Sequence, residues 1–235
     1  MLADIRAAFA FLTILPTGSP SGRRRGWAIA FFPLVGLCIG ALLVAIATHS
    51  PFDRDLSAFL ILLVWVAITG GLHLDGFGDS CDGLLAAVAP EERRRIMRDP
   101  RAGMWAVAGT TLLLLGKWLA IRAAPAELLI LAPVLGRWAL VLAAYAFPAA
   151  SEISLAAAFR DGLGRLQVIT AALWLVILLT NVELLALAVG CSGFSLAFGW
   201  WAARRLGGGL SGDVYGAVCE LTELLSLLAL AALYG

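Results

Sequence analysis

Seven apolar stretches constrain this chain more than any other feature of its sequence. They cover residues 27–48, 56–72, 105–124, 127–146, 166–180, 184–203 and 217–234. A helix needs about 20 apolar residues to cross about 30 Å of hydrocarbon, and in lipid only helices or closed barrels satisfy their own backbone hydrogen bonds. We therefore predict an all-α fold, a polytopic integral membrane helical bundle of about seven transmembrane helices.

The composition agrees with a membrane protein and gives no sign of a second domain. The 235 residues are 61% hydrophobic and 14% charged, and the mean hydropathy is +0.93. No repeat, low-complexity tract or polar segment of any size separates the spans, so we predict that residues 1–235 form a single membrane domain. The four cysteines form no Cys-x-x-Cys pair, which argues against a zinc site, an iron–sulfur cluster or a disulfide framework.

The basic residues predict how the bundle sits in the membrane. With seven spans, thirteen arginines fall on the side of the N-terminus and two on the other side. The thirteen are Arg6, Arg23, Arg24, Arg25, Arg93, Arg94, Arg95, Arg98, Arg101, Arg160, Arg165, Arg204 and Arg205. Cytoplasmic loops are enriched in Arg and Lys, so we expect a multi-pass protein of the bacterial inner (cytoplasmic) membrane with this side in the cytoplasm. Merging the fifth and sixth spans would move Arg204 and Arg205 to the wrong side.

The first residues predict a different kind of helix. The segment 2–15 is too short to span a bilayer, and its apolar positions 2, 5, 9 and 12 recur at helical spacing. We expect an interfacial or re-entrant helix there. It lacks the small-residue cleavage pattern of a secretory signal, so we do not expect it to be removed.

Three aspartates, Asp75, Asp79 and Asp82, follow the second span within one short segment. If this segment is helical, the i, i+4 and i+7 spacing places them on one face. Mg²⁺ takes one or two carboxylates and completes its shell with water and phosphate oxygens. The motif therefore predicts metal-assisted phosphoryl chemistry at a membrane surface, and the alternative is helix capping. The interleaved glycines are expected to let a phosphate ester approach the metal closely.

A second acidic cluster lies at the start of the last span. Asp213 is followed at i+7 and i+10 by Glu220 and Glu223, on nearly the same helix face and within an apolar helix. Carboxylates inside a membrane are costly and mark functional sites by default. The alternative is a structural ion pair with Lys117 or Arg137, which lie mid-span and should face a carboxylate or a bound phosphate.

An arginine-rich loop over residues 91–101 falls on the same predicted side as both acidic clusters. Guanidinium groups bind phosphate oxygens bidentately, which an ammonium group does not do. We assign the arginines at 93–95 to topology and predict that Arg98 and Arg101 bind substrate. For His73, two residues before Asp75, two readings stay open: a partner within the site and an interfacial residue.

Further motifs accompany these clusters along nearly the whole chain. They are FLTILP at 11–16, FPLVG at 32–36, TGGLHLDG at 69–76, IMRD at 96–99 and the glycines at 208, 209 and 212. Together with the acidic residues, these motifs resemble the adenosylcobinamide-GDP ribazoletransferase family, also called cobalamin synthases or cobalamin-5′-phosphate synthases. Two positions depart from the family pattern, since Pro100 stands where serine is expected and Ser211 where threonine is expected.

The resemblance implies a transferase that completes the nucleotide loop in cobalamin biosynthesis. A hydroxyl of α-ribazole, or of α-ribazole 5′-phosphate, attacks the cobinamide-side phosphorus of adenosylcobinamide-GDP, and GMP leaves. The expected cofactor is Mg²⁺, and the expected partners are the two substrates and the lipid bilayer, without nucleic acid. The oligomeric state stays open, a homo-oligomer included.

The predicted site residues fall into three groups. The metal ligands are Asp75, Asp79, Asp82, Asp213, Glu220 and Glu223. The substrate-binding residues are Arg98, Arg101, Lys117, Arg137 and Ser211. The catalytic residues are Asp82, Asp79 and His73. Asp82 is favoured over Asp79 as the base because it ends the motif and can sit away from the metal.

Two other functions remain open. A CDP-alcohol phosphotransferase of phospholipid synthesis also uses clustered aspartates, but its Ala-Arg pair after the first Asp-Gly and its longer gap to the later aspartates are absent. A secondary transporter would use the buried charges of the spans as an ion path, but transporter sites lie near the membrane midplane. Turnover separates these functions, because a carrier needs no Mg²⁺ and releases no GMP.

Overall fold

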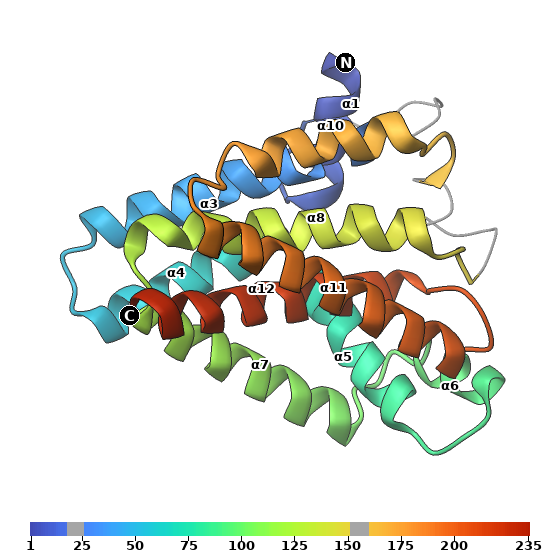
Figure 1. Cartoon of the computed structure of the whole chain (residues 1–235). Coiled ribbons are helices and arrows are strands. Elements are labelled where there is room, and N and C mark those ends of the chain that lie inside the picture. Colours follow the sequence, from blue (N-terminus) through green and yellow to red (C-terminus); the bar gives the residue numbers. More distant parts are fainter. Residues whose placement is uncertain (18–25, 151–159) are drawn as a thin grey trace.

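The computed structural model describes residues 1–17, 26–150 and 160–235, and the elements of this part are helices, which confirms the predicted all-α class. In chain order they are α1 (Leu2–Leu12), α2 (Gly26–Ile29), α3 (Phe32–His49), α4 (Arg54–Thr69), α5 (Leu72–Leu85), α6 (Pro90–Ile96), α7 (Met104–Ala123), the 3-10 helix η1 (Ala126–Ile130), α8 (Leu131–Ala146), α10 (Arg165–Val176), α11 (Val182–Arg205) and α12 (Gly212–Tyr234). Figure 1 shows α3, α4, α7, α8, α10, α11 and α12 running back and forth along one common direction, with their connections at the two ends of the bundle.

The exact number of seven membrane spans stays a prediction. Within the described residues, five helical segments are long and apolar enough to cross a membrane, or up to six if the bent pair of α4 and α5 is one span. The five are Gly26–His49, Met104–Ala123, Ala126–Ala146, Val182–Arg205 and Gly212–Tyr234. The predicted fifth span is α10, whose 12 residues reach only about 18 Å at 1.5 Å per residue. All seven apolar stretches contain a helix, and the helices of two of them, α4 and α10, are shorter than a straight span needs.

Two consecutive glycines separate α4 from α5. Gly70 and Gly71 have φ values of 60° and 66°, in the left-handed region that glycine adopts without a Cβ clash. The two helices meet at 90°. The predicted span 56–72 therefore ends at Thr69, and α5 turns away from the common direction at one end of the bundle (Figure 1). This bend carries the aspartate motif out of the span and toward α6.

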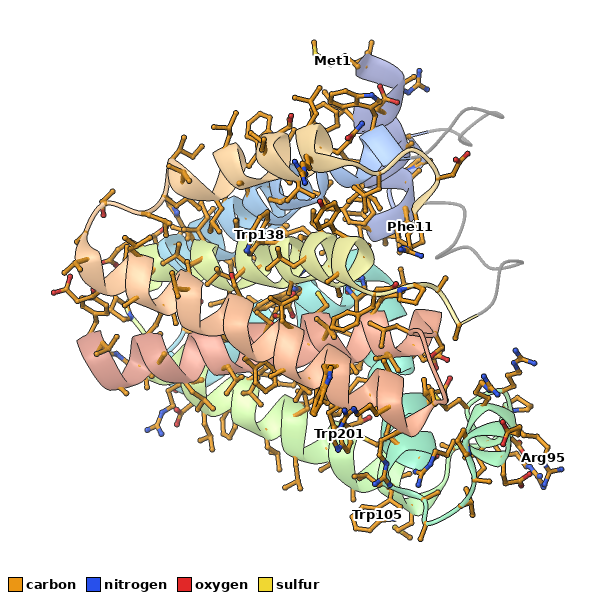
Figure 2. All side chains as sticks on the ribbon, turned by 45° about the vertical axis from the view of Figure 1, so that its right-hand side comes forward. Met1, Phe11, Arg95, Trp105, Trp138 and Trp201 are labelled. Carbon is orange, nitrogen blue, oxygen red and sulfur yellow. The ribbon has the colours of Figure 1, made fainter. Side chains whose placement is uncertain are left out.

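The centre of the bundle is formed by α8 and α12. Most residues of α8 are buried, and α12 packs against α5, α7, α8 and α11. In contrast, α7 and α11 expose large apolar side chains such as Leu112 and Val189, as helices facing lipid do. The predicted N-terminal helix is present as α1, and the Phe11 ring stacks on Phe32 of α3 with centroids 5.8 Å apart. Figure 2 shows Phe11 turned toward the body of the molecule and Met1 at the outer end of α1.

Candidate active site

The site is built where α5 crosses α12, and two glycines set how closely the helices approach. A Cβ atom added to Gly76 would lie 2.9 Å from the Asp213 Cα, and one added to Gly216 would lie 2.8 Å from the His73 carbonyl oxygen. No side chain fits at such distances without moving a backbone. The glycines interleaved with the motif aspartates were expected to leave the backbone open to substrate. This expectation is wrong at Gly76, because helix packing covers its backbone. The close crossing brings the two acidic clusters of the sequence together.

Three aspartates gather around this crossing. Asp75 and Asp79 of α5 line an open cleft of about 760 Å³ against α7. Asp75 also lines a smaller pocket on the other side of α5, together with Asp213 of α12. Asp79 lies within electrostatic reach of both Asp75 and Asp213. The carboxylates of Asp75 and Asp79 have no hydrogen bond or ion pair to any other described residue, so both are available to a ligand.

Asp82 holds a different position, at the start of α7. Its carboxylate accepts hydrogen bonds from the backbone N–H groups of Gly103, at 2.6 Å, and Ala106, at 2.9 Å. An anion is stabilised at a helix N-terminus because the first N–H groups lack partners within the helix. The capping alternative thus describes Asp82 in this structure, and the motif aspartates divide into two that face the cleft and one that fastens α5 to α7.

The two glutamates of α12 belong to a buried ion-pair network. Lys117 of α7 donates to Glu220 Oε2 at 2.6 Å and also pairs with Glu223, which in turn pairs with Arg137 of α8. The Lys117 ammonium lies 4.6 Å from the centre of the Trp65 ring. Lys117 is 3% exposed and Glu223 is 1% exposed. The ion-pair alternative is therefore the observed arrangement, and it joins α7, α8 and α12 in the bundle core.

The six predicted metal ligands consequently do not form a single cluster. Among the described residues, no three His, Cys, Asp or Glu side chains are placed to hold a metal ion as they stand. Glu220 and Glu223 are neutralised by Lys117 and Arg137, so these two cations are also turned to carboxylates and not to a substrate phosphate. The carboxylates that remain for a metal are those of Asp75, Asp79 and Asp213.

The arginine-rich loop lies at the same end of the bundle as this crossing. Figure 2 shows Arg95 of α6 projecting away from the body there. Arg93, assigned above to topology, is buried and donates to the carbonyls of Gly83 and Leu84, which fastens α6 to the C-terminus of α5. The Asp99 carboxylate accepts two hydrogen bonds from the Arg101 guanidinium and one from the Arg101 backbone N–H, and these lower the Asp99 pKa to about 2. Arg101 is thus engaged by Asp99.

Arg98, the other predicted phosphate ligand, is better placed. Its side chain is exposed, has no ion pair within the described ranges, and lies close enough to Asp213 to act on its carboxylate. It can therefore bind an anion beside Asp213.

A glycine-rich turn sets the position of Asp213. The backbone of Leu210 donates to Pro148 and accepts from Ala150, both at 2.9 Å, so the turn before α12 is fastened to the end of α8. Ser211 then caps α12 by accepting from the Val214 N–H at 3.4 Å. In this structure the Ser211 hydroxyl serves the start of the helix. Its role as a substrate ligand stays a prediction.

Two buried polar side chains complete the surroundings. His73 is 5% exposed and its Nδ1 atom has no hydrogen-bond partner among the described residues. Tyr215 is 8% exposed and its hydroxyl likewise has none within that part of the chain. Sequence reasoning missed Tyr215, whose only signal was a hydroxyl within an apolar helix two residues after Asp213.

Known proteins resemble this chain over its whole length. The family model described as cobalamin-5-phosphate synthase matches residues 4–231. An adenosylcobinamide-GDP ribazoletransferase of Geotalea daltonii is 35% identical, with 100% of this chain and 99% of the relative covered. Proteins of the same name from Deinococcus radiodurans (37%; 95% and 83% covered) and Pseudomonas syringae (39%; 96% and 98% covered) are also similar. No solved structure matches. The chain therefore belongs to the cobalamin-5-phosphate synthase family, the adenosylcobinamide-GDP ribazoletransferases, as its motifs indicated.

Proposed function

We propose that this protein joins α-ribazole, or α-ribazole 5′-phosphate, to adenosylcobinamide-GDP and releases GMP. The observation that carries the proposal is the full-length match to relatives named for this activity, across the segments that form the crossing of α5 and α12. The geometry supports it, because carboxylates that pair with no other described residue and an exposed arginine lie at one end of the bundle, where a polar phosphate substrate has access.

The acidic residues fit Mg²⁺ as the cofactor. Asp75, Asp79 and Asp213 offer oxygen ligands only, and hard cations prefer these. Asp75 and Asp213, which line the same pocket, would hold the ion, and water and phosphate oxygens would complete its shell. When bound, the metal would neutralise charge on the phosphoryl oxygens during the displacement.

The chain's own groups have separate tasks in this transfer. Asp79, whose carboxylate pairs with no other described residue, takes the proton from the attacking hydroxyl, a task that sequence reasoning gave first to Asp82. Arg98 binds phosphate oxygens of the GMP that leaves, since a planar guanidinium pairs with two oxygens at once. Asp82 keeps α5 against α7, and the network around Glu223 keeps α12 in place.

We expect the purified protein in detergent to release GMP from adenosylcobinamide-GDP only when both α-ribazole and Mg²⁺ are present. EDTA should abolish the reaction, because the displacement at a pyrophosphate develops charge that a metal must neutralise. The measurement is GMP quantified against time with each component omitted in turn.

Undiminished GMP release in metal-free buffer would contradict the mechanism. Turnover of a CDP-alcohol in place of adenosylcobinamide-GDP would favour the phospholipid enzyme. Transport of a solute into liposomes that contain the protein, without GMP release, would favour the secondary transporter.

We place the end of the bundle that holds α5 and α6 in the cytoplasm, in line with the arginine bias. Cysteines introduced singly by Ala87→Cys and Arg204→Cys, in a variant without the four native cysteines, should resist an impermeant thiol reagent in intact cells. Phe52→Cys, at the other end, should react. All three positions are exposed, so permeabilised cells provide the control for reactivity. Labelling of Ala87→Cys and Arg204→Cys from outside would reverse the orientation.

A further inference from the structure

A small pocket opens beside Asp75 and Asp213, on the side of α5 that faces the bundle. Its volume is about 200 Å³, and it is enclosed by α1, α2, α3, α5, α8 and α12. Sites that enclose a whole ligand usually measure about 300–1,000 Å³. This pocket therefore suits one ring system of a larger substrate, with the rest of the molecule outside.

The pocket walls are apolar. Phe11 and Phe32, with their rings nearly parallel at 21°, form one part, and Ile29, Leu140 and Ala144 add aliphatic surface. Such walls favour a flat aromatic ring system with few polar atoms, because each polar atom placed against them would lose its hydrogen bonds to water.

Besides Asp75 and Asp213, two further polar side chains interrupt these walls, and each carries a polar atom without a hydrogen-bond partner in the described part of the chain. His73 and Tyr215 line the pocket, and the His73 Nδ1 atom and the Tyr215 hydroxyl have no hydrogen bond within the described residues. Buried polar atoms are nearly always paired, so unpaired atoms on side chains that line a cavity indicate a ligand that supplies the missing partners.

We propose that this pocket binds the aromatic base of the acceptor nucleoside, with His73 and Tyr215 as hydrogen-bond partners for its few polar atoms. The proposal rests on the proposed function, which supplies an acceptor that carries a dimethylbenzimidazole on ribose. A benzimidazole joined to ribose has one free ring nitrogen, which suits apolar walls with two polar groups. Guanine, the base of the donor, has several donors and acceptors along its edge, and these walls would leave most of them unpaired.

The position of the pocket also fits the acceptor. Asp75 lines both the pocket and the open cleft toward α7, so a base seated in the pocket directs its ribose toward the three aspartates. The donor then reaches the same aspartates from the cleft, which is open enough for its charged phosphates. Acceptor and donor thus meet from opposite sides of α5.

Two variants test the pocket by different means. Ala144→Leu fills it, and Tyr215→Phe removes a hydroxyl that bonds to no described residue, so the second change should not disturb folding. We expect each to raise the KM for α-ribazole at least tenfold, with the KM for adenosylcobinamide-GDP within twofold of wild type. With Ala144→Leu, the rise should be smaller for the riboside of unsubstituted benzimidazole, which is narrower by two methyl groups.

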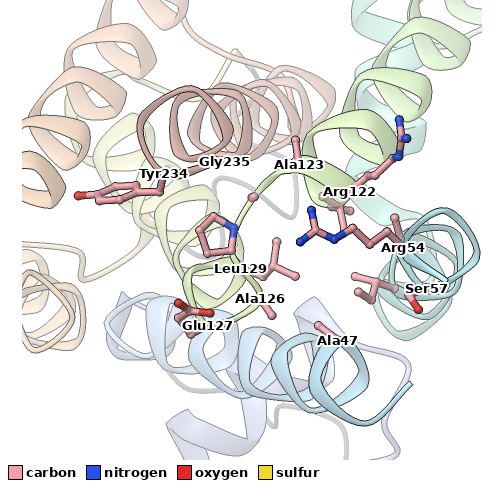
Figure 3. A pocket seen from close by; sticks show the side chains of 15 residues that line it. Ala47, Arg54, Ser57, Arg122, Ala123, Ala126, Glu127, Leu129, Tyr234 and Gly235 are labelled. Atoms are coloured by element: carbon pink, nitrogen blue, oxygen red, sulfur yellow. The ribbon is translucent and has the colours of Figure 1, made fainter. Parts of the chain in front are cut away.

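The matched control for Ala144→Leu is the same substitution, alanine to leucine, in the wall of another cavity. Ala47 lines a cavity of about 520 Å³ at the opposite end of the bundle, into which the Arg54 guanidinium reaches (Figure 3). Ala47→Leu should leave both KM values unchanged.

The outcomes separate this inference from the proposed function. If neither pocket variant changes the KM for α-ribazole, or if the KM for adenosylcobinamide-GDP rises instead, the pocket does not hold the acceptor base. If the wild-type protein releases no GMP at any acceptor concentration, the proposed function itself fails.

Discussion

Asp75→Asn and Asp79→Asn are each expected to lower the rate of GMP release at least about a hundredfold, the size of effect that removal of one electrostatic or acid–base group produces. Both carboxylates line the cleft and have no hydrogen bond or ion pair to another described residue, so their replacement removes a ligand and a base but no structural contact seen in that part of the chain. The unfolding midpoint of both variants in detergent should stay at the wild-type value.

Asp82→Asn should behave differently in the same experiments. Its carboxylate accepts two backbone hydrogen bonds at the start of α7, and an amide offers only one oxygen to replace them. The expected loss of stability is about 1 kcal/mol, typical of a weakened helix cap. Asp99→Asn, in the exposed loop, is the control for a lost negative charge. Near-normal rates for folded Asp75→Asn and Asp79→Asn would contradict the assignment of these residues to the site.

Glu223→Leu is expected to be the most destabilising single change in the buried network. It leaves Arg137 without its carboxylate and Lys117 with only one, and an unpaired charge in a buried pair costs about 3–5 kcal/mol. The free energy of unfolding in detergent should fall by that amount. Glu91→Leu, which removes an exposed pair with Arg94, should change it by less than about 1 kcal/mol.

Removing both partners tests whether the network is structural. The double change Glu223→Leu with Arg137→Met replaces a buried ion pair by apolar side chains, which is often neutral for stability. We expect it to recover most of the lost stability and to keep Mg²⁺-dependent GMP release. If the folded double variant no longer released GMP in response to Mg²⁺, Glu223 would belong to the metal site.

The sequence predicted the helices well, and the number of them that cross the membrane stays a prediction. Apolar length alone located α3, α7, α8, α11 and α12, because a spanning helix must be continuous and apolar. The break at Gly70 and Gly71 was visible as two glycines, but only their positive φ values turn them into a 90° bend. α10 was overestimated because its apolar residues continue past Val176, where the helix ends.

The sequence predicted only part of the site, because several of its contacts join residues that lie far apart along the chain. Helical spacing placed Glu220 two turns from Asp213, which is about 10 Å deeper in the bundle and beyond reach of one ion. Its cationic partner, Lys117, lies on another helix, so no local pattern revealed the pair. Likewise, Asp82 caps the start of α7, which lies 21 residues or more further along the chain. The packing of Gly76 on Asp213 depends on the tertiary crossing of α5 and α12.

The most direct test of the account is the binding of Mn²⁺ in place of Mg²⁺, measured by the loss of the free-ion electron paramagnetic resonance signal. The protein should be saturated with adenosylcobinamide-GDP in the absence of acceptor, so that no turnover occurs. We predict saturable Mn²⁺ binding by the wild-type protein and by Asp99→Asn, and at least about tenfold weaker binding when Asp75→Asn and Asp213→Asn are combined, since each removes one charged oxygen ligand. Wild-type Mn²⁺ affinity in that double variant would contradict the claim that the crossing of α5 and α12 holds the metal.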